Sequence, residues 1–465
     1  MKPIRITNRS EGPGIQYFGW SGRGWADGGP VSAGPMSSGA PSWERWGSRL
    51  GINIVRVGFS MKHFLPGDLK TGFSFSQSIK KGMENTDVSW AKSRDTSYSY
   101  SIERCRDLGW KILICLNPSL NTEWEPHRLT ESTHLLEFWE SFCFHFAGFI
   151  EDGWPGTAGL FEITNEPDIG YFDGETALPD YPGIPRGITP ERYRLLLERA
   201  FRGIRRAVPD AKIVGPGLAR WNRKWIEKVL HKNDPIAIDG LSYHNVRGDL
   251  QDADTLRQAK SLLSGCLPSS SGIVLNSEWA WWPDHDPDDL ETALRAAQIL
   301  HRQAAGGAYA SLYLGPAQPR DFKKGLGVLK FDPEEPDSVE TTKTFYAFRL
   351  MARGILGGQR LAVFNPLKRL EVSALHKDNQ EIVVTLLNPN RKKLKDVSIL
   401  IDESLDVMQN GLLKIYRFDQ MHRDDFMESI AGVLDKFCVE PQSIVQFVIP
   451  MGRPAVGLAL NSAES

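Results

Sequence analysis

Residues 160 to 168 read LFEITNEPD, and this stretch decides how the rest of the chain is interpreted. Its first half, LFEIT, is a short apolar and β-branched run of the kind that forms a buried strand. Asn165 and Glu166 follow at once, so the strand ends on an amide and a carboxylate. Pro167 comes next and is expected to keep the backbone of Glu166 away from helical geometry. The stretch therefore predicts a buried strand that presents polar side chains at its carboxyl end.

The same strand pattern recurs along the first three quarters of the chain, with amphipathic helical segments between the runs. The eight candidate strands span 15–20, 53–59, 111–116, 159–164, 212–217, 238–244, 272–278 and 309–314. The candidate helices span 41–50, 95–108, 131–150, 190–207, 222–231, 253–265, 288–306 and 341–356. Thr189 is the expected N-cap of the fourth helix, with Pro190 at its first position. Eight strands, each followed by a helix, predict an α/β fold of the (β/α)8 TIM barrel type.

The pattern changes after Gly358 to short alternating strands separated by Asn, Pro, Asp and Gly. Clear examples are EIVVTLLN from residue 381 and SIVQFVIP from residue 443. This texture is typical of an antiparallel β-sandwich. We therefore expect a catalytic barrel over residues 1–357 and a C-terminal β-sandwich domain over 358–465. Residues 1–12 are a candidate edge strand for that second domain.

Composition excludes several classes of protein. The chain has 465 residues, a length that exceeds what a single hydrophobic core usually supports, and this agrees with two domains. Lys and Arg total 55 against 57 Asp and Glu, so no net positive charge favours nucleic acid as a partner. The five cysteines lack metal-ligand spacing, and no apolar run has the length of a signal peptide or a membrane span. We expect a cytoplasmic protein, or a secreted one if a leader has been removed, and the oligomeric state stays open.

Two carboxylates are expected at the mouth of the barrel. Glu166 follows the fourth strand and Glu278 follows the seventh, and in such barrels the functional groups gather at the carboxyl ends of the strands. Cleavage of a glycosidic bond needs such a pair, because one acid protonates the leaving oxygen while the other carboxylate attacks or activates water. Asp284 and Asp286 also follow the seventh strand, but Glu278 is preferred because it lies nearer the strand end.

These motifs resemble clan A of the retaining glycoside hydrolases, on the NEP tripeptide after the fourth strand, the Glu after the seventh and Arg56 on the second. The trailing β domain is similar to that of the β-xylosidase and α-L-iduronidase family, family 39. The resemblance implies that Glu166 is the general acid/base and Glu278 the nucleophile. It further implies that Asn165 holds the 2-hydroxyl of the sugar and that Arg56 steadies the nucleophile. No metal or organic cofactor is required.

The sixth strand departs from the family pattern. Related enzymes carry a Tyr two positions after the His, whereas this chain reads SYHNV, with Tyr243 directly before His244. Strand alternation places these two side chains on opposite faces unless a bulge intervenes, so either could reach the site. Further candidates for contact with a carbohydrate are Asn117 after the third strand and aromatic rings that could pack on sugar faces. These rings are Trp124, Trp279 and Trp281.

A carbohydrate is therefore the expected substrate, and a β-type linkage cleaved by double displacement is the expected reaction. The alternative is a non-catalytic barrel that binds carbohydrate, although mere binding gains little from two neighbouring carboxylates. A metal-dependent hydrolase or an aldolase would need a ligand cluster or a strand-end Lys, which the sequence does not display. The sugar, the linkage and the choice between exo and endo action are left open by the sequence.

Overall fold

The structure is a computed structural model in which the chain divides into two compact units. One unit comprises Ile15–Ala352, and the other comprises Met1–Gly14 together with Arg353–Ser465. The division falls between 352 and 353 rather than between 357 and 358. The residues described are 2–22, 41–64, 74–84, 98–118, 130, 132–169, 171–172, 175–176, 188–231, 236–246, 248, 250–267, 272–280, 286–315, 317–320, 325, 327–332, 335, 338–378, 380–405, 407, 412–430 and 434–452.

The first unit is a closed barrel of eight parallel strands, so the predicted TIM barrel is confirmed. Going round the barrel, the order is β10-β11-β2-β3-β4-β5-β8-β9. The strands are β2 (Tyr17–Gly22), β3 (Ile54–Ser60), β4 (Lys111–Asn117), β5 (Ala158–Ile163), β8 (Ile213–Leu218), β9 (Gly240–Asn245), β10 (Ile273–Trp279) and β11 (Ala310–Leu314). Each of the eight runs predicted from the sequence forms one of them.

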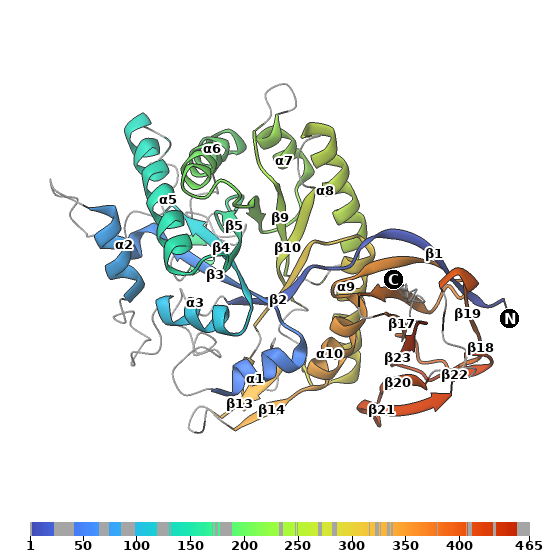
Figure 1. Cartoon of the computed structure of the whole chain (residues 1–465). Coiled ribbons are helices and arrows are strands. Elements are labelled where there is room, and N and C mark those ends of the chain that lie inside the picture. The colour runs from blue at the N-terminus through green and yellow to red at the C-terminus, as the bar shows by residue number, and fades with distance from the viewer. Residues whose placement is uncertain are drawn as a thin grey trace, which may run out of the picture. The chain divides into compact units, whose positions relative to one another are not determined.

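Helices surround the barrel strands (Figure 1). They are α1 (Pro41–Leu50), α2 (Phe75–Glu84), α3 (Tyr98–Asp107), α5 (Thr133–Gly153), α6 (Pro190–Ala207), α7 (Arg223–Leu230), α8 (Asp252–Cys266), α9 (Leu290–Ala305) and α10 (Lys343–Ile355). Short elements are the 3-10 turn η2 (Met61–Phe64), the β6 (Tyr171–Phe172) and β7 (Glu175–Thr176) pair, and the sheet of β12 (Ala317–Pro319), β13 (Leu329–Phe331) and β14 (Val339–Thr341). η2 and α2 lie between β3 and α3, where no helix was predicted from the sequence.

An apolar layer fills the barrel interior and supports the polar side chains beyond it. Buried residues of six strands form this layer: Ile54, Leu113, Leu160, Val214, Ile273, Leu275, Ala310 and Leu312. Because side chains alternate along a strand, the residues two positions further on face the same interior. Those residues include Arg56, Cys115 and Glu162, all of them buried. The barrel interior is therefore apolar at one layer of side chains and carries charged side chains at the next, two residues further along the strands. These charged side chains form the base of the site.

The second unit is built on an eight-stranded sheet in the order β19-β1-β15-β16-β17-β23-β20-β21, beside a β18-β22 pair. Its strands are β1 (Ile4–Pro13), β15 (Gln359–Phe364), β16 (Glu371–Lys377), β17 (Glu381–Asn388), β18 (Leu394–Val397), β19 (Ile399–Ile401), β20 (Leu412–Phe418), β21 (Arg423–Ile430), β22 (Phe437–Val439) and β23 (Ser443–Pro450).

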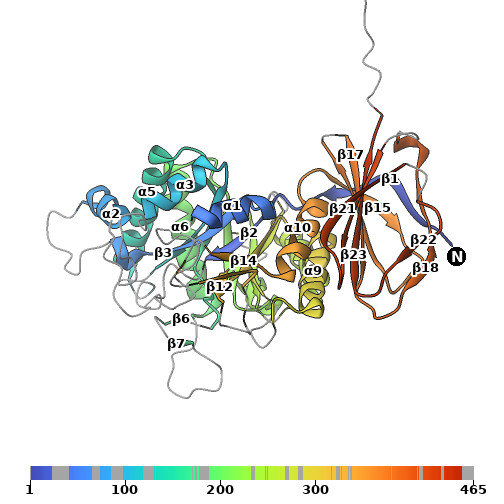
Figure 2. The same ribbon diagram turned by 90° about the horizontal axis from the view of Figure 1, so that it is seen from below.

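One hydrophobic core joins strands from both ends of this sheet, including Ile4 of β1 and Ile415 of β20. The sheet must therefore fold over on itself, which is the arrangement of a sandwich. Figure 2 shows β1, coloured blue, among the orange and red strands of this unit. β1 pairs antiparallel with β15 and parallel with β19, so one strand pairing departs from a purely antiparallel fold. None of the helices described in either unit has the length and apolar character needed to span a membrane.

The predicted N-cap of α6 is confirmed, since the Thr189 side chain accepts a hydrogen bond from the Arg192 backbone N–H at 3.3 Å. We expect Thr189→Ala to lower the free energy of unfolding by about 1 kcal/mol, because that N–H loses its acceptor. Urea denaturation measures the change. Thr189→Ser, which keeps the hydroxyl, is the matched control. Equal stability of the Ala and Ser variants would show that the cap contributes nothing.

Candidate active site

Glu166 leaves the end of β5 in a left-handed backbone conformation. Its φ is 47°, and Thr164 two positions earlier has a φ of 69°. Pro167 was expected to keep the Glu166 backbone away from helical geometry, and a φ of 47° does lie outside the right-handed helical region. Such values cost about 1–3 kcal/mol per residue and persist where the surroundings impose them. Here Glu166 N donates to Gly217 O of β8 at 2.7 Å, and this bond fixes the turn that presents the carboxylate.

Glu278 owes its direction to a bulge in β10. In the pairing with β9, Asn276 lies opposite Tyr243 and Glu278 lies opposite His244, so Ser277 is one extra residue. A bulge of this kind turns the side chains that follow it to the other face. Glu278 therefore shares the barrel interior with His244. No residue of β10 indicated this bulge in advance.

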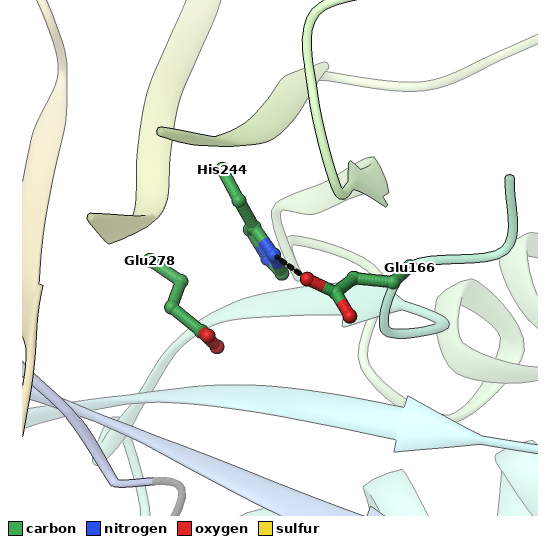
Figure 3. A group of neighbouring side chains, drawn as sticks. All are labelled: Glu166, His244 and Glu278. Atoms are coloured by element: carbon green, nitrogen blue, oxygen red, sulfur yellow. Dashed lines mark hydrogen bonds and ion pairs between the residues drawn. The ribbon is translucent and has the colours of Figure 1, made fainter. Parts of the chain in front are cut away.

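The bulge and the strained turn bring the two predicted carboxylates together. One oxygen of Glu166, one oxygen of Glu278 and a ring nitrogen of His244 all lie within 4.8 Å of one another, and all three residues are buried (Figure 3). Two carboxylates and an imidazole are also a possible donor set for a transition metal. This is the only such group of metal-binding side chains in the part of the chain that the structure describes.

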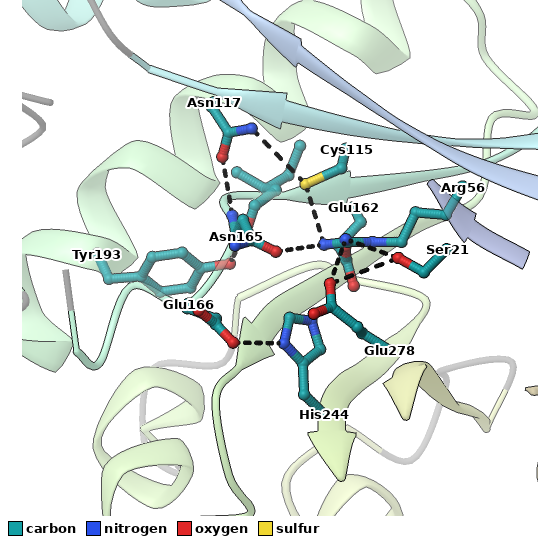
Figure 4. Close-up of polar contacts among 11 residues, drawn as sticks. Ser21, Arg56, Cys115, Asn117, Glu162, Asn165, Glu166, Tyr193, His244 and Glu278 are labelled. Carbon is teal, nitrogen blue, oxygen red and sulfur yellow. Dashed lines mark hydrogen bonds and ion pairs between the residues drawn. The ribbon is translucent and has the colours of Figure 1, made fainter. Parts of the chain in front are cut away.

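Arg56 is the centre of the polar contacts next to the pair of carboxylates (Figure 4). Its Nε lies 2.6 Å and its Nη2 2.5 Å from Glu162 Oε2, and its Nη1 lies 3.2 Å from Glu278 Oε2. Nη2 also donates to Asn165 Oδ1 at 2.7 Å. Ser21 Oγ accepts from Arg56 Nη1 at 3.3 Å and donates to Glu278 Oε2 at 3.4 Å. A single guanidinium thus orients Glu278 and Asn165.

The charges of this cluster shift one another's ionisation. Burial is the largest single influence on the pKa of Glu162 and would raise it. The positive charge of Arg56, with smaller effects of His244, Ser277 and Ser242, together outweighs burial, so that the pKa is lowered. Glu162 is therefore an anion in the barrel interior. A buried charge of this kind is tolerated only with a partner, and Arg56 is that partner.

His244 connects the two carboxylates electrostatically. Its Nδ1 lies 2.9 Å from Glu166 Oε1 in a hydrogen bond. Burial lowers the pKa of His244, but the negative charge of Glu278 and the bond to Glu166 outweigh burial, and the pKa is raised above its ordinary value. This contact places the His244 ring and the Glu166 carboxylate so that one proton can lie between them.

Asp168 is a further buried carboxyl beside the pair. Its Oδ1 accepts from the Ala219 backbone N–H at 3.0 Å. Burial raises the pKa of Asp168 to about 6, and the charge of Glu166 adds to the increase. Asp168 therefore holds a proton more readily than an exposed aspartate does.

The other predicted contacts fall into three groups. Asn117 and Asn165 belong to the cluster, since Asn117 Oδ1 accepts from Asn165 N at 2.9 Å. Tyr243 and Trp279 do not, and our expectation that they contact a sugar is wrong. Both are fully buried on the outer side of the barrel, where the Tyr243 hydroxyl donates to Asp252 and the Trp279 ring packs on Tyr313. Trp124 and Trp281 lie outside the described residues.

The sequence also contained signals that we did not use. Glu162 is four residues before Glu166 and two after the inward-facing Leu160, so alternation alone places its carboxylate inside the barrel. The same rule places Ser21 of β2 there. Asp168 carried no comparable signal, because it follows the turn rather than the strand.

Comparison with known proteins supports the fold. No protein-family model and no curated protein matches the sequence. Similar solved structures include a GH30 endoxylanase from Clostridium papyrosolvens, 14% identical, with a TM-score of 0.65 and coverage of 97% of this chain and 100% of that one. A GH39 β-xylosidase from Caulobacter crescentus is 13% identical, with a TM-score of 0.59 and the same coverage. The resemblance to family 39 of clan A is thus confirmed at the level of the fold.

We expect Arg56→Met to lower the free energy of unfolding by about 3–5 kcal/mol, because Glu162 would be left buried without a counter-ion. Chemical denaturation measures the loss. The double variant Arg56→Met/Glu162→Leu removes both charges and should recover much of it. If the double variant is as unstable as the single one, the contact between Arg56 and Glu162 does not compensate the burial of charge.

The raised pKa of His244 predicts a pH-dependent contribution to stability. Protonated His244 is stabilised in the folded protein, so its contribution is present below the unfolded pKa of about 6.5 and is lost as the pH rises through the higher folded value. The difference in unfolding free energy between wild type and His244→Gln should therefore shrink as the pH rises above neutrality. A series of denaturant titrations from pH 5.5 to about 9 tests this. A difference that is constant with pH would contradict it.

Proposed function

We propose that this protein is a retaining glycoside hydrolase that cleaves a β-glycosidic bond in an oligo- or polysaccharide by double displacement. The observation that carries the proposal is the 4.8 Å limit on the distance between an oxygen of Glu166 and an oxygen of Glu278. Retaining enzymes hold their carboxyl groups about 5–5.5 Å apart, whereas inverting enzymes keep about 6.5–9.5 Å for a water molecule. The short separation favours direct attack by one of the two.

The partners of each carboxylate favour one assignment of roles. Glu278 contacts the permanent positive charge of Arg56, an arrangement that suits a carboxylate nucleophile. Glu166 contacts His244 instead, a group that can share a proton with it. Glu166 is therefore the proposed general acid and base. Asn165 has its oxygen engaged by Arg56, so its NH2 group is the part that a sugar hydroxyl would meet.

The reaction then proceeds in two steps. Glu278 attacks the anomeric carbon, the bond to the leaving oxygen breaks, and Glu166 gives that oxygen a proton. Water next attacks the anomeric carbon of the glycosyl ester, Glu166 takes a proton from the water, and the ester bond to Glu278 breaks. The sugar is released with its original anomeric configuration, and both carboxyl groups return to their starting state.

Two alternative functions can be distinguished from glycoside hydrolysis. A non-catalytic carbohydrate-binding barrel shares the fold but has no use for two neighbouring buried carboxylates. A metal-dependent hydrolase is favoured by one observation, the proximity of Glu166, His244 and Glu278. Under the proposed mechanism these side chains act without a metal.

We expect wild-type protein to hydrolyse members of a panel of aryl β-glycosides, with chelator leaving the rate unchanged. Glu166→Gln should reduce kcat/KM about 10²–10⁴-fold, because the acid and base are lost, and Glu278→Gln should reduce it at least as far. Glu103→Gln, an exposed carboxylate on α3, is the matched control and should keep full activity. Release of aryl alcohol measures each rate.

The leaving group and the product anomer test the two roles separately. A dinitrophenyl glycoside needs little protonation, so its first step should survive Glu166→Gln but not Glu278→Gln. Proton NMR of the first product should show the β anomer. Hydrolysis that survives both substitutions, an inverted product, or loss of activity with chelator would each contradict the proposal.

A further inference from the structure

The bulge that aims Glu278 is visible from both neighbours of β10. Against β9, the two residues Ser277 and Glu278 follow Asn276 where β9 has one. Against β11, Asn276 pairs with Ser311 and Trp279 pairs with Tyr313, so three steps on β10 match two on β11. Regular ladder pairing is therefore interrupted over Asn276 to Trp279 on both sides. Other contacts must hold this segment in place.

Hydrogen bonds on the outer side of the barrel supply such contacts at both ends of the bulge. At one end, Asn276 Nδ2 donates to Asp252 Oδ2 at 3.3 Å. At the other end, Trp279 Nε1 donates to Ser311 Oγ at 2.9 Å, and Ser311 Oγ donates to Gln303 Oε1 at 2.5 Å. Gln303 Nε2 then donates to Asp252 Oδ2 at 2.8 Å. The chain of contacts starts and ends on β10 and passes through α8, α9 and β11.

All five side chains of this ring are buried. Asp252 is 2% exposed, and Asn276, Trp279, Gln303 and Ser311 are all below 1%. Water cannot replace a lost partner at such a depth, so removing one member leaves another unsatisfied. Hydrogen bonds are also stronger in this low-dielectric setting than at the surface. The ring is therefore a stiff connection between the two ends of the bulge.

We propose that Asp252, Gln303 and Ser311 are positioning residues that clamp the β10 bulge and so direct Glu278 toward Arg56 and the reacting carbon. None of the three touches the substrate in this assignment. They act through Asn276 and Trp279, the residues that border the bulge. The catalytic consequence rests on the proposed function, whereas the effect on the direction of Glu278 does not.

The same ring of side chains also contacts the strand that carries His244. The Tyr243 hydroxyl donates to the other oxygen of Asp252, Oδ1, at 3.2 Å. Tyr243 directly precedes His244 and lies opposite Asn276. One buried carboxylate thus ties the ends of β9 and β10 together from outside. This connection fixes His244 and Glu278 relative to each other inside the barrel.

Packing alone does not explain the ring. The Trp279 indole already contacts the Tyr313 ring, with 5.0 Å between ring centroids, and the Phe348 ring, with 5.7 Å. These contacts bury the indole, but ring packing is less directional than a hydrogen bond. The bond from Nε1 to Ser311 adds a directional contact that ties the indole to β11. A residue displaced by about 1 Å can cost 10²-fold in rate, so this restraint matters for catalysis.

Gln303→Met tests the clamp, because it keeps the length of the side chain and removes both hydrogen bonds. We expect kcat on an aryl glycoside to fall about 10–100-fold while KM stays within about twofold, since binding groups are unchanged. Ser311→Ala removes only the hydroxyl between Trp279 and Gln303, should act in the same direction, and serves if Gln303→Met fails to fold. Gln298→Met is the matched control, a buried glutamine on the same helix that is outside the ring.

Crystal structures of these variants give a readout that does not need hydrolysis. In Gln303→Met and Ser311→Ala, Glu278 should leave its position 3.2 Å from Arg56, and in Gln298→Met it should stay there. Lower melting temperatures with unchanged kcat and an unmoved Glu278 would overturn the proposal and leave the ring a purely structural role. If the wild type hydrolyses nothing, the proposed function fails while the position of Glu278 still decides on the clamp.

Discussion

The contact between Arg56 and Glu162 is the interaction on which the rest of the site depends. An arginine inside a barrel is costly unless its charge is compensated, and Glu162 provides that compensation at 2.5–2.6 Å. Once paired, the guanidinium still has Nη1 and Nη2 directed toward Glu278 and Asn165. The planar fork of arginine can serve three partners at fixed angles, which lysine could not do. Glu162 thus compensates the charge of Arg56, and Arg56 in turn orients Glu278 and Asn165.

Irregular backbone places both proposed catalytic residues. Glu166 depends on a left-handed turn and Glu278 on a bulge, and neither belongs to the regular strand geometry of the barrel. Each irregularity is held by a neighbouring element: Gly217 of β8 accepts from Glu166 N, and the ring around Asp252 borders the bulge. The regular barrel therefore supplies stiffness, while these two departures from it set the direction of the side chains.

The sequence predicted what depends on periodicity and missed what depends on exceptions to it. Eight strands and the surrounding helices follow from apolar period and capping residues such as Thr189, so they could be read directly. Trp279 was misassigned because proximity to Glu278 was given more weight than alternation, which places successive side chains on opposite faces. The bulge itself has no local signature in the sequence LNSEW. Asp252 becomes relevant only once α8 is seen to bring it against Asn276 and Gln303.

The charges of the site agree with the chemistry proposed for it. Arg56 and Glu162 cancel, the pair of His244 and Glu166 is neutral when it holds one proton, and Glu278 leaves a net charge of −1. An oxocarbenium-like transition state is positive, so it meets a complementary field. When Glu278 becomes an ester, Glu166 has lost its proton, and the net charge is still −1. The negative charge of Glu278 raises the pKa of His244, and esterification of Glu278 removes that charge. The pair of His244 and Glu166 then binds a proton less strongly, so Glu166 is available as a base in the second step.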